Sequence, residues 1–152
     1  MTAIASSSGF AQMQALAANQ ASAAGMGRLM GMDGAEAGEG WMLFHAIPAA
    51  AHGNPIGITH GGFAATLLDS AMSCAVHTLL TDRETYVTTD LHISFVKAIT
   101  PATGRVTARG EVVTRGRRLA TARGTLVDAN GRLLATGVAT CMIMASNNEG
   151  AQ

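Results

Sequence analysis

The segment from about Gly62 to Leu80 constrains the fold more than any other part of the chain. It is the longest apolar run, it is too long for a strand, and it contains no proline and no internal glycine. We therefore predict one long helix. Because this helix is apolar around most of its circumference, we expect a sheet to wrap around it, since a helix on a wet surface would carry a broad polar face.

Strand-like segments lie on both sides of the predicted helix. Two precede it, at Leu29 to Met32 and Trp41 to Ile47, and the acidic, Gly-rich stretch from Asp33 to Gly40 is predicted to connect them as a hairpin. Four follow it, at Thr85 to Phe95, Gly104 to Thr114, Arg117 to Val127 and Leu133 to Met144. Runs of antiparallel strands around one helix predict the α+β fold class.

The chain of 152 residues has the length of one domain and shows no break in composition. Ser8 is placed to cap a short amphipathic helix over residues 10–17, which we expect to end at Gly25. The polar end after Ala145 should be frayed. We predict an N-terminal helix and tail over residues 1–24, one domain over 25–145 and a flexible tail over 146–152.

A polar stripe runs along the predicted long helix. At 100° per residue its members fall within about a third of the circumference. They are Thr66, Asp69, Ser70, Ser73 and His77. The stripe has small hydroxyls and one carboxylate where a surface helix would have long charged side chains, so it should face a confined polar space. Asp69 is then either an ordinary hydrogen-bonded helix residue or a catalytic carboxylate in a cleft that holds little water.

The segment His60-Gly61-Gly62 directly precedes this helix. Two glycines allow a ligand to approach the backbone closely. The first amides of a helix are unpaired and lie at the positive end of its dipole, where they can stabilise a developing oxyanion. The simpler interpretation is a turn before a helix, and the pattern alone leaves both open.

The formal net charge is zero, which argues against nucleic acid as a partner. The histidines lack the spacing of a zinc site, so we expect no metal and no cofactor. Cys74 and Cys141 lie among apolar residues and are predicted to be buried thiols. No apolar run is long enough to cross a membrane, and the Ala- and Ser-rich start lacks a basic leader, so we expect a cytoplasmic protein that does not bind membranes.

Three arginines surround Gly116 at a predicted strand tip: Arg115, Arg117 and Arg118. A local basic cluster suits a small polyanion, and the planar guanidinium fork matches phosphate. The alternative is a solvated turn with ordinary surface arginines.

In these features the sequence resembles the hotdog-fold acyl-CoA thioesterases, in the phenylacetate-degradation (PaaI-like) subgroup. The matching text is Asn54-Pro55-Ile56-Gly57-Ile58-Thr59-His60-Gly61-Gly62, then Asp69 on the helix, then Thr88 to Phe95 and the Arg-Gly-Arg turn. The resemblance covers roughly residues 25 to 144. It implies an antiparallel sheet wrapped around one long central helix and hydrolysis of an acyl-CoA with a medium-chain or aryl acyl group.

The resemblance also implies roles for individual residues. Asp69 would be the nucleophile or the general base, and the Gly61 amide would polarise the thioester carbonyl. Asn54 would position the attacking water or the carbonyl, and His60 would orient the site near the sulfur. A hydroxyl on the strand after the helix would assist, at Thr88 or at its neighbour Thr89. Gly62 would contact the substrate, and Arg115, Gly116, Arg117 and Arg118 would contact the coenzyme A phosphates.

In this family the site lies between two subunits, so the resemblance implies at least a homodimer, and a homotetramer as a dimer of dimers. Helix geometry agrees, because Gly61 and Asp69 of one chain are separated by about 12 Å of helix, too far for both to contact one carbonyl group. Two other functions stay open. One is an enoyl-CoA hydratase or dehydratase, since Asn54-Pro55-Ile56 matches the start of a segment of those enzymes, although Gly57 stands where they have His. The other is a non-catalytic module that binds acyl-CoA.

Overall fold

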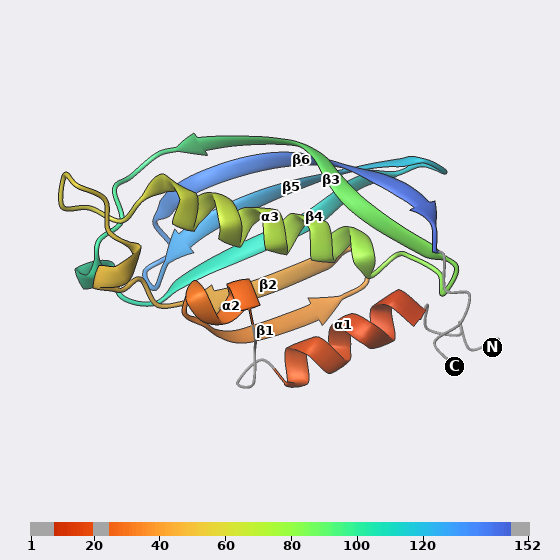
Figure 1. Ribbon diagram of the computed structural model, residues 1–152, viewed down its shortest axis with the longest axis horizontal. Coiled ribbons are helices and arrows are strands. Elements are labelled where there is room, and N and C mark those ends of the chain that lie inside the picture. Colours follow the sequence, from red (N-terminus) through yellow and green to blue (C-terminus); the bar gives the residue numbers. More distant parts are fainter. Residues whose placement is uncertain (1–7, 20–24, 147–152) are drawn as a thin grey trace.

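The computed structural model describes residues 8–19 and 25–146. One antiparallel sheet of six strands curves around the long helix α3, in the order β1-β2-β4-β5-β6-β3 (Figure 1). The elements are α1 (Ser8–Ala18), α2 (Gly25–Leu29), β1 (Met32–Gly38), β2 (Trp41–Ala46), α3 (Gly61–His77), β3 (Glu84–Phe95), β4 (Val106–Arg115), β5 (Leu119–Asp128) and β6 (Leu133–Ala145). The predicted α+β arrangement, with the sheet around one long helix, is confirmed.

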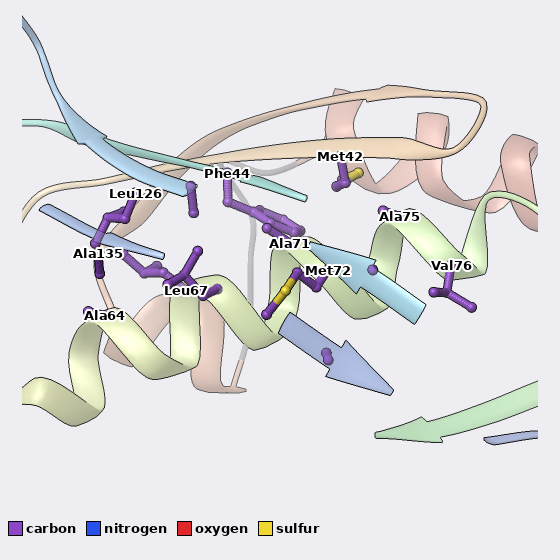
Figure 2. Close-up of a cluster of buried hydrophobic side chains, with 14 of the residues drawn as sticks. Met42, Phe44, Ala64, Leu67, Ala71, Met72, Ala75, Val76, Leu126 and Ala135 are labelled. Carbon is purple, nitrogen blue, oxygen red and sulfur yellow. The ribbon is translucent and has the colours of Figure 1, made fainter. Parts of the chain in front are cut away.

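The core lies between α3 and the concave face of the sheet. On α3, Leu67, Leu68, Ala71 and Met72 have no exposed surface (Figure 2). Alternate residues of the strands complete the core, because every second side chain of a strand points to the same face. Each fully buried Leu or Met side chain contributes about 1.5–3 kcal/mol from the removal of apolar surface from water. This packing holds α3 against the sheet.

A row of three glycines crosses the middle of the sheet under α3. Gly110 of β4 pairs with Gly124 of β5, which pairs with Gly137 of β6. A Cβ at Gly110 would overlap the carbonyl oxygen of Ala71, and a Cβ at Gly124 would lie 3.0 Å from side-chain atoms of Leu68 and Met72. The helix backbone therefore rests almost directly on the sheet backbone. We call these three residues the glycine row.

The predictions for the first strand and the segment before it were wrong. Residues 33–38, predicted as part of a hairpin connection, form most of β1, and the turn itself is only Glu39-Gly40, with Gly40 at φ +77°. Leu29, predicted to begin a strand, ends the short helix α2 instead. Pairing with β2 along the whole of β1 outweighs the weak strand propensity of Gly, Asp and Glu.

The N-terminal helix α1 begins at Ser8 as predicted but ends at Ala18, well before Gly25. The Gly9 amide donates to the carbonyl of Leu80 at 3.2 Å, and Gln12 Oε1 lies 2.7 Å from His77 Nε2, so α1 is bound to the C-terminal end of α3. The predicted frayed tail falls largely on residues 147–152, outside the described residues. Within the described ranges, no helix combines the length and the apolarity that crossing a membrane requires.

Candidate active site

Asp69 lies midway along α3, on the side that faces β3. The hydroxyl of Thr88, on β3, donates a hydrogen bond of 2.9 Å to Asp69 Oδ1. Cys141 Sγ lies 4.0 Å from the same hydroxyl, at the buried side of the pair. A threonine hydroxyl that donates to one oxygen fixes the orientation of the carboxylate and leaves its other oxygen available. The structure thus brings together two of the predicted site residues within one chain.

A bulge in β3 selects Thr88 over its neighbour. Thr88 pairs with Cys141 and Asp90 pairs with Thr140, so Thr89 is the extra residue between two regular pairs. The Thr89 hydroxyl donates to the carbonyl of Thr140 at 3.2 Å and does not contact Asp69. The alternation of side chains along a regular strand could not have decided this, because the bulge shifts it by one residue.

His60 is the N-cap of α3 and holds the loop in a defined shape. Its Nδ1 accepts a hydrogen bond of 2.8 Å from the amide of Gly62, and its carbonyl accepts one of 2.9 Å from the amide of Phe63. Because Nδ1 is an acceptor here, the proton of the neutral ring lies on Nε2. Among the residues that the structure describes, none accepts a hydrogen bond from the Gly61 amide. A free donor therefore lies at the positive end of the helix.

Asn54 organises the loop that precedes His60. Its side-chain Oδ1 accepts hydrogen bonds of 3.2 Å from the backbone amides of Ile56 and Ile58. The backbone amide of Asn54 donates to the carbonyl of Ile58 at 2.8 Å. The side-chain oxygen is thus used inside the loop, and the Nδ2 group remains as the donor of this residue. Asn54 can offer a substrate hydrogen-bond donors only.

A cavity of about 270 Å³ adjoins the free Gly61 amide. We call it the polar cavity, and its lining includes Asn54, Thr59, His60, Gly61, Phe95 and Lys97. The Thr59 hydroxyl is buried and has no hydrogen-bond partner within the described chain. Lys97, the sole lysine of the sequence, forms no ion pair with any described residue. Sequence reasoning gave no role to Thr59, although it stands within the motif that precedes α3, or to Lys97, which belongs to no motif.

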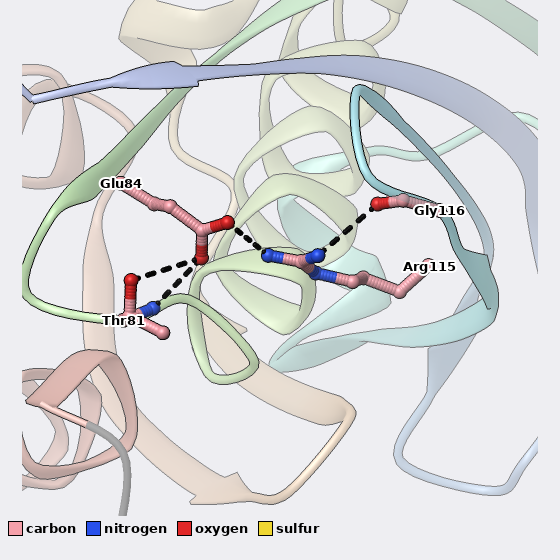
Figure 3. A network of polar contacts seen from close by, with 4 residues as sticks. All are labelled: Thr81, Glu84, Arg115 and Gly116. Atoms are coloured by element: carbon pink, nitrogen blue, oxygen red, sulfur yellow. Dashed lines mark hydrogen bonds and ion pairs between the residues drawn. The ribbon is translucent and has the colours of Figure 1, made fainter.

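Arg115 is engaged within the protein. Its guanidinium forms a 2.5 Å ion pair with Glu84 and donates to the carbonyl of Gly116 at 3.2 Å (Figure 3). Glu84 also accepts from the amide of Thr81 at 3.0 Å, and this bond, together with Arg115, holds the pKa of Glu84 below its usual value. This network ties the β4–β5 turn to the start of β3.

Arg117 and Arg118 are exposed and form no ion pair with any residue in the described ranges. Their turn lies near Glu84, seven residues beyond the end of α3, whereas Gly61 begins that helix (Figure 1). A helix of 17 residues is about 25 Å long at 1.5 Å per residue. One chain thus holds its free arginines and its free amide at opposite ends of α3.

The two cysteine thiols, Cys74 on α3 and Cys141 on β6, lie on the buried side of the polar stripe. Both cysteines are free; Cys141 is buried and Cys74 is half-buried. Burial raises the pKa of Cys74 to about 11, and burial also lowers the pKa of His77, whose ring makes an edge contact with Tyr86. Neither thiol is therefore ionised near neutral pH, and Asp69 is the nucleophilic or basic group that this part of the stripe offers. Within the described residues no three His, Cys, Asp or Glu side chains lie close enough to hold a metal ion.

Comparisons with known proteins identify the family and the fold. Residues 56–135 match the family model for the thioesterase superfamily, a span that contains Gly61, Asp69 and Thr88. No curated protein is significantly similar in sequence. The solved structure of AziG from S. sahachiroi is 27% identical, with a TM-score of 0.76 over 81% of this chain and 98% of that one.

Two further solved structures are similar. A phenylacetic acid degradation-related protein from Ralstonia eutropha is 28% identical, with a TM-score of 0.67 over 74% of this chain and 85% of that one. Thioesterase superfamily member 2 of zebra fish is 25% identical, with a TM-score of 0.69 over 88% of this chain and 96% of that one.

Proposed function

The chain belongs to the thioesterase superfamily, and on that premise we propose that it hydrolyses an acyl-CoA to the free acid and coenzyme A. The observation that carries this proposal is that α3 holds two parts of a hydrolytic site at separate places, which we call half-sites. The helix begins with a free amide at Gly61, and about 12 Å further along it holds a carboxylate, Asp69, which Thr88 orients. Thioester hydrolysis needs a donor at the carbonyl oxygen and a carboxylate at the carbonyl carbon.

In the proposed reaction the thioester oxygen accepts a hydrogen bond from the Gly61 amide. Asp69 either takes a proton from the attacking water or attacks the carbonyl carbon itself, and water then cleaves the resulting anhydride. In both routes the bond from carbon to sulfur breaks, and the thiolate leaves and gains a proton. The proton that the thiolate gains is the one released by the attacking water, and the Nε2–H of His60 can donate a hydrogen bond to the departing sulfur, because Nδ1 is occupied by Gly62.

The two half-sites require a second copy of the chain. β3 is an edge strand of the sheet, and it exposes the apolar side chains of Val87, Leu91 and Phe95. Phe95 lies beside Gly61, and Thr88 lies beside Asp69. An antiparallel pairing of β3 with its copy, centred near Leu91, would place Phe95 of one subunit across from Thr88 of the other. The free amide of each subunit would then face the carboxylate of its neighbour.

The first test is release of free thiol from a panel of phenylacetyl-, hydroxybenzoyl- and straight-chain acyl-CoAs. We expect Asp69→Ala to lower kcat by at least about a hundredfold, since a general acid or base contributes about 10²–10⁴. Asp82→Ala, at an exposed carboxylate just beyond α3, is the matched control. Thiol release at the wild-type rate from folded Asp69→Ala would remove Asp69 from the mechanism. A hydratase would release no thiol, and a binding module would bind without turnover.

The coenzyme A part of the proposal rests on the two free arginines. We expect Arg117→Ala to raise KM for acyl-CoA about tenfold through loss of a phosphate contact, and to leave KM unchanged for the same acyl group on N-acetylcysteamine. Arg83→Ala, at another exposed arginine, should change neither KM. Equal increases for both thiols would show that Arg117 does not hold the nucleotide.

A further inference from the structure

A second cavity, of about 380 Å³, adjoins the candidate active site on the other side of His60. We call it the methionine cavity. Its lining includes Met26 and Met30 from the region of α2, His52, Phe63, Thr66 and His60. The His52 and Phe63 rings pack against each other, with centroids 4.8 Å apart. The volume is within the range of about 300–1,000 Å³ that small-molecule sites occupy.

The polar groups in the lining of the methionine cavity are already paired inside the protein. His52 Nδ1 accepts from the amide of Ala49 at 2.9 Å, and His52 Nε2 donates to the carbonyl of Leu29 at 2.7 Å. The Thr66 hydroxyl donates to the carbonyl of Gly62 at 2.8 Å, and the Gly62 amide donates to His60 Nδ1. Among these side chains only His60, at the shared boundary with the polar cavity, keeps a free donor. A ligand inside this cavity would find hydrocarbon, thioether and ring faces.

The polar cavity differs in its unpaired donors, although seven of its twelve lining residues are also apolar. Among the described residues, the Gly61 amide and Thr59 hydroxyl have no hydrogen-bond partner, Lys97 has no ion-pair partner, and Asn54 keeps its Nδ2 donors. The Thr59 hydroxyl is buried, and a buried polar group left unpaired costs about 1–3 kcal/mol, so this side of the site favours a ligand that carries acceptors. Lys97 is exposed and adds a positive charge at the rim of the cavity. The thiol side of an acyl-CoA has amide and phosphate oxygens, whereas a simple acyl chain has none beyond its carbonyl.

From the paired polar groups of one cavity and the unpaired donors of the other, we propose that the methionine cavity binds the acyl chain and the polar cavity binds the pantetheine arm. This assignment rests on the proposed hydrolysis. The thioester then lies across His60 and Gly61, with its carbonyl oxygen at the Gly61 amide. Any hydroxyl or carboxylate on the acyl chain would lose its water without gaining a partner. The substrates are therefore acyl groups with an unsubstituted hydrocarbon end.

Met26 and Met30 set the size of the acyl group. Methionine has three flexible bonds and fills irregular spaces, so these side chains can adapt to chains of different length. Met26 stands at the mouth of the cavity, where 57% of its surface is exposed. α2 begins at Gly25 and is followed by Gly31, and both glycines have positive φ. A larger side chain at Met26 can therefore be accommodated by the fold while it shortens the cavity.

The test compares Met26→Trp with Leu29→Trp, which places the same side chain on the same short helix at a residue that does not line the cavity. The substrates are acetyl- and octanoyl-CoA and the corresponding N-acetylcysteamine thioesters. For Met26→Trp we expect the ratio of kcat/KM for octanoyl to acetyl to fall about tenfold with both thiols, because a few methylenes in an apolar pocket are worth that much or more. Leu29→Trp should leave the ratio unchanged, and Met26→Ala should raise it.

Three outcomes would overturn the assignment: an equal loss for both acyl groups, a loss confined to the CoA thioesters, or the same ratio in Met26→Trp and Leu29→Trp. Binding of the non-hydrolysable thioethers S-octyl-CoA and S-methyl-CoA, measured by calorimetry, separates this proposal from the proposed reaction. If no thioester is hydrolysed but Met26→Trp weakens only S-octyl-CoA, the cavity assignment stands and the hydrolysis does not. If thioesters are hydrolysed and both thioethers bind Met26→Trp as they bind wild type, the hydrolysis stands and the cavity assignment does not.

Discussion

His60 is an unusual N-cap. Ser, Thr, Asp and Asn are the preferred residues there, because a short side-chain oxygen reaches the amide of the second or third helical residue. The imidazole Nδ1 of His60 does the same for Gly62, the second helical residue. The amide of the first, Gly61, is left over. A histidine at this position therefore caps the helix, spares one amide for a ligand and still presents Nε2 to it.

The spared amide can be deleted by substitution, because Gly61 is the first residue of α3. Proline is well tolerated at this helix position, and the preceding His60, at φ −60° and ψ 138°, has the extended backbone that proline requires of its neighbour. We expect Gly61→Pro to keep the fold and to lower kcat by about 10²–10³, the usual effect of losing one oxyanion donor.

Gly61→Ala is the control for this variant, because it keeps the amide and also adds a Cβ, 3.0 Å from the exposed ring of Phe95. Thiol release by the two variants, compared after circular dichroism has shown both to be folded, decides the role of the amide. Similar rates for Gly61→Pro and Gly61→Ala would mean that the Gly61 amide does not act on the substrate.

At the residue scale, local patterns carried part of the information about the candidate site. The lone carboxylate on the polar stripe identified Asp69 as a candidate, and the structure holds that side chain by a hydrogen bond from Thr88. The choice between Thr88 and Thr89 depended on a bulge that no local signal marks. The ion pair of Arg115 could not be foreseen either, because its partner Glu84 is 31 positions away.

At the scale of elements, the glycine row determines where α3 lies. Side chains normally separate a helix from a sheet, but the three paired glycines have none, and at Gly110 the sheet backbone meets the backbone of Ala71. The helix is closest to the sheet at this point, two residues beyond Asp69. This backbone contact at Gly110 leaves little freedom for the middle of α3 to shift against β4, and the Thr88 hydrogen bond joins Asp69 to β3.

The glycine row gives a prediction about stability. A Cβ at Gly110 meets the backbone carbonyl of Ala71, which cannot move without the helix, whereas a Cβ at Gly124 meets the ends of the flexible Leu68 and Met72 side chains at 3.0 Å. We expect Gly110→Ala to lower the free energy of unfolding by about 3 kcal/mol and Gly124→Ala by about 1 kcal/mol. Urea denaturation measures both, and equal losses would show that α3 is not held by backbone contact at Gly110.

Among the elements, the start of α3 was predicted within one residue and its end within three, because a long apolar run without proline or internal glycine has few other solutions. The four strands after it were also predicted, with ends one or two residues away, since they alternate and end at turn residues. β1 was missed because its sequence, with two charged residues and two glycines in seven, has little strand propensity, and only its pairing with β2 makes it a strand.

At the scale of the whole molecule, the predicted hotdog fold and the resemblance to thioesterases are confirmed. The pairing of subunits remains a prediction, although the described chain supports it in three ways. The free amide and the oriented carboxylate lie apart on one helix, the edge strand β3 exposes apolar side chains, and the free arginines lie at the far end from the amide. A two-fold axis would bring the free amide of one subunit to the carboxylate of the other, place the two β3 edges side by side, and bring the free arginines of one subunit to the amide end of the other.

Mixed dimers test whether each site draws on two chains. A dimer of one Asp69→Ala chain and one Gly61→Pro chain contains one intact site if the residues come from different subunits, so we expect about half of the wild-type kcat per dimer. The control joins a wild-type chain to a chain that carries both substitutions, and both of its sites would then be broken. The measurement is thiol release by dimers purified through two different affinity tags.

If each chain instead had a complete site of its own, the results would be reversed. The dimer of two single variants would be inactive, and the dimer of wild type with the double variant would keep half of its activity. The two arrangements therefore predict opposite rankings of the same two samples, and no calibration of absolute rate is required.

The glycine row also bears on how such a protein can change over generations. Substitutions elsewhere in the core alter side chains that can repack, but a substitution at Gly110 moves the backbone of the helix, so selection should remove it whatever the substrate is. The lining of the methionine cavity, partly exposed and carried by a five-residue helix between two glycines, has no such constraint. Descendants of this chain can thus diverge in what they accept while inheriting the same placement of Asp69.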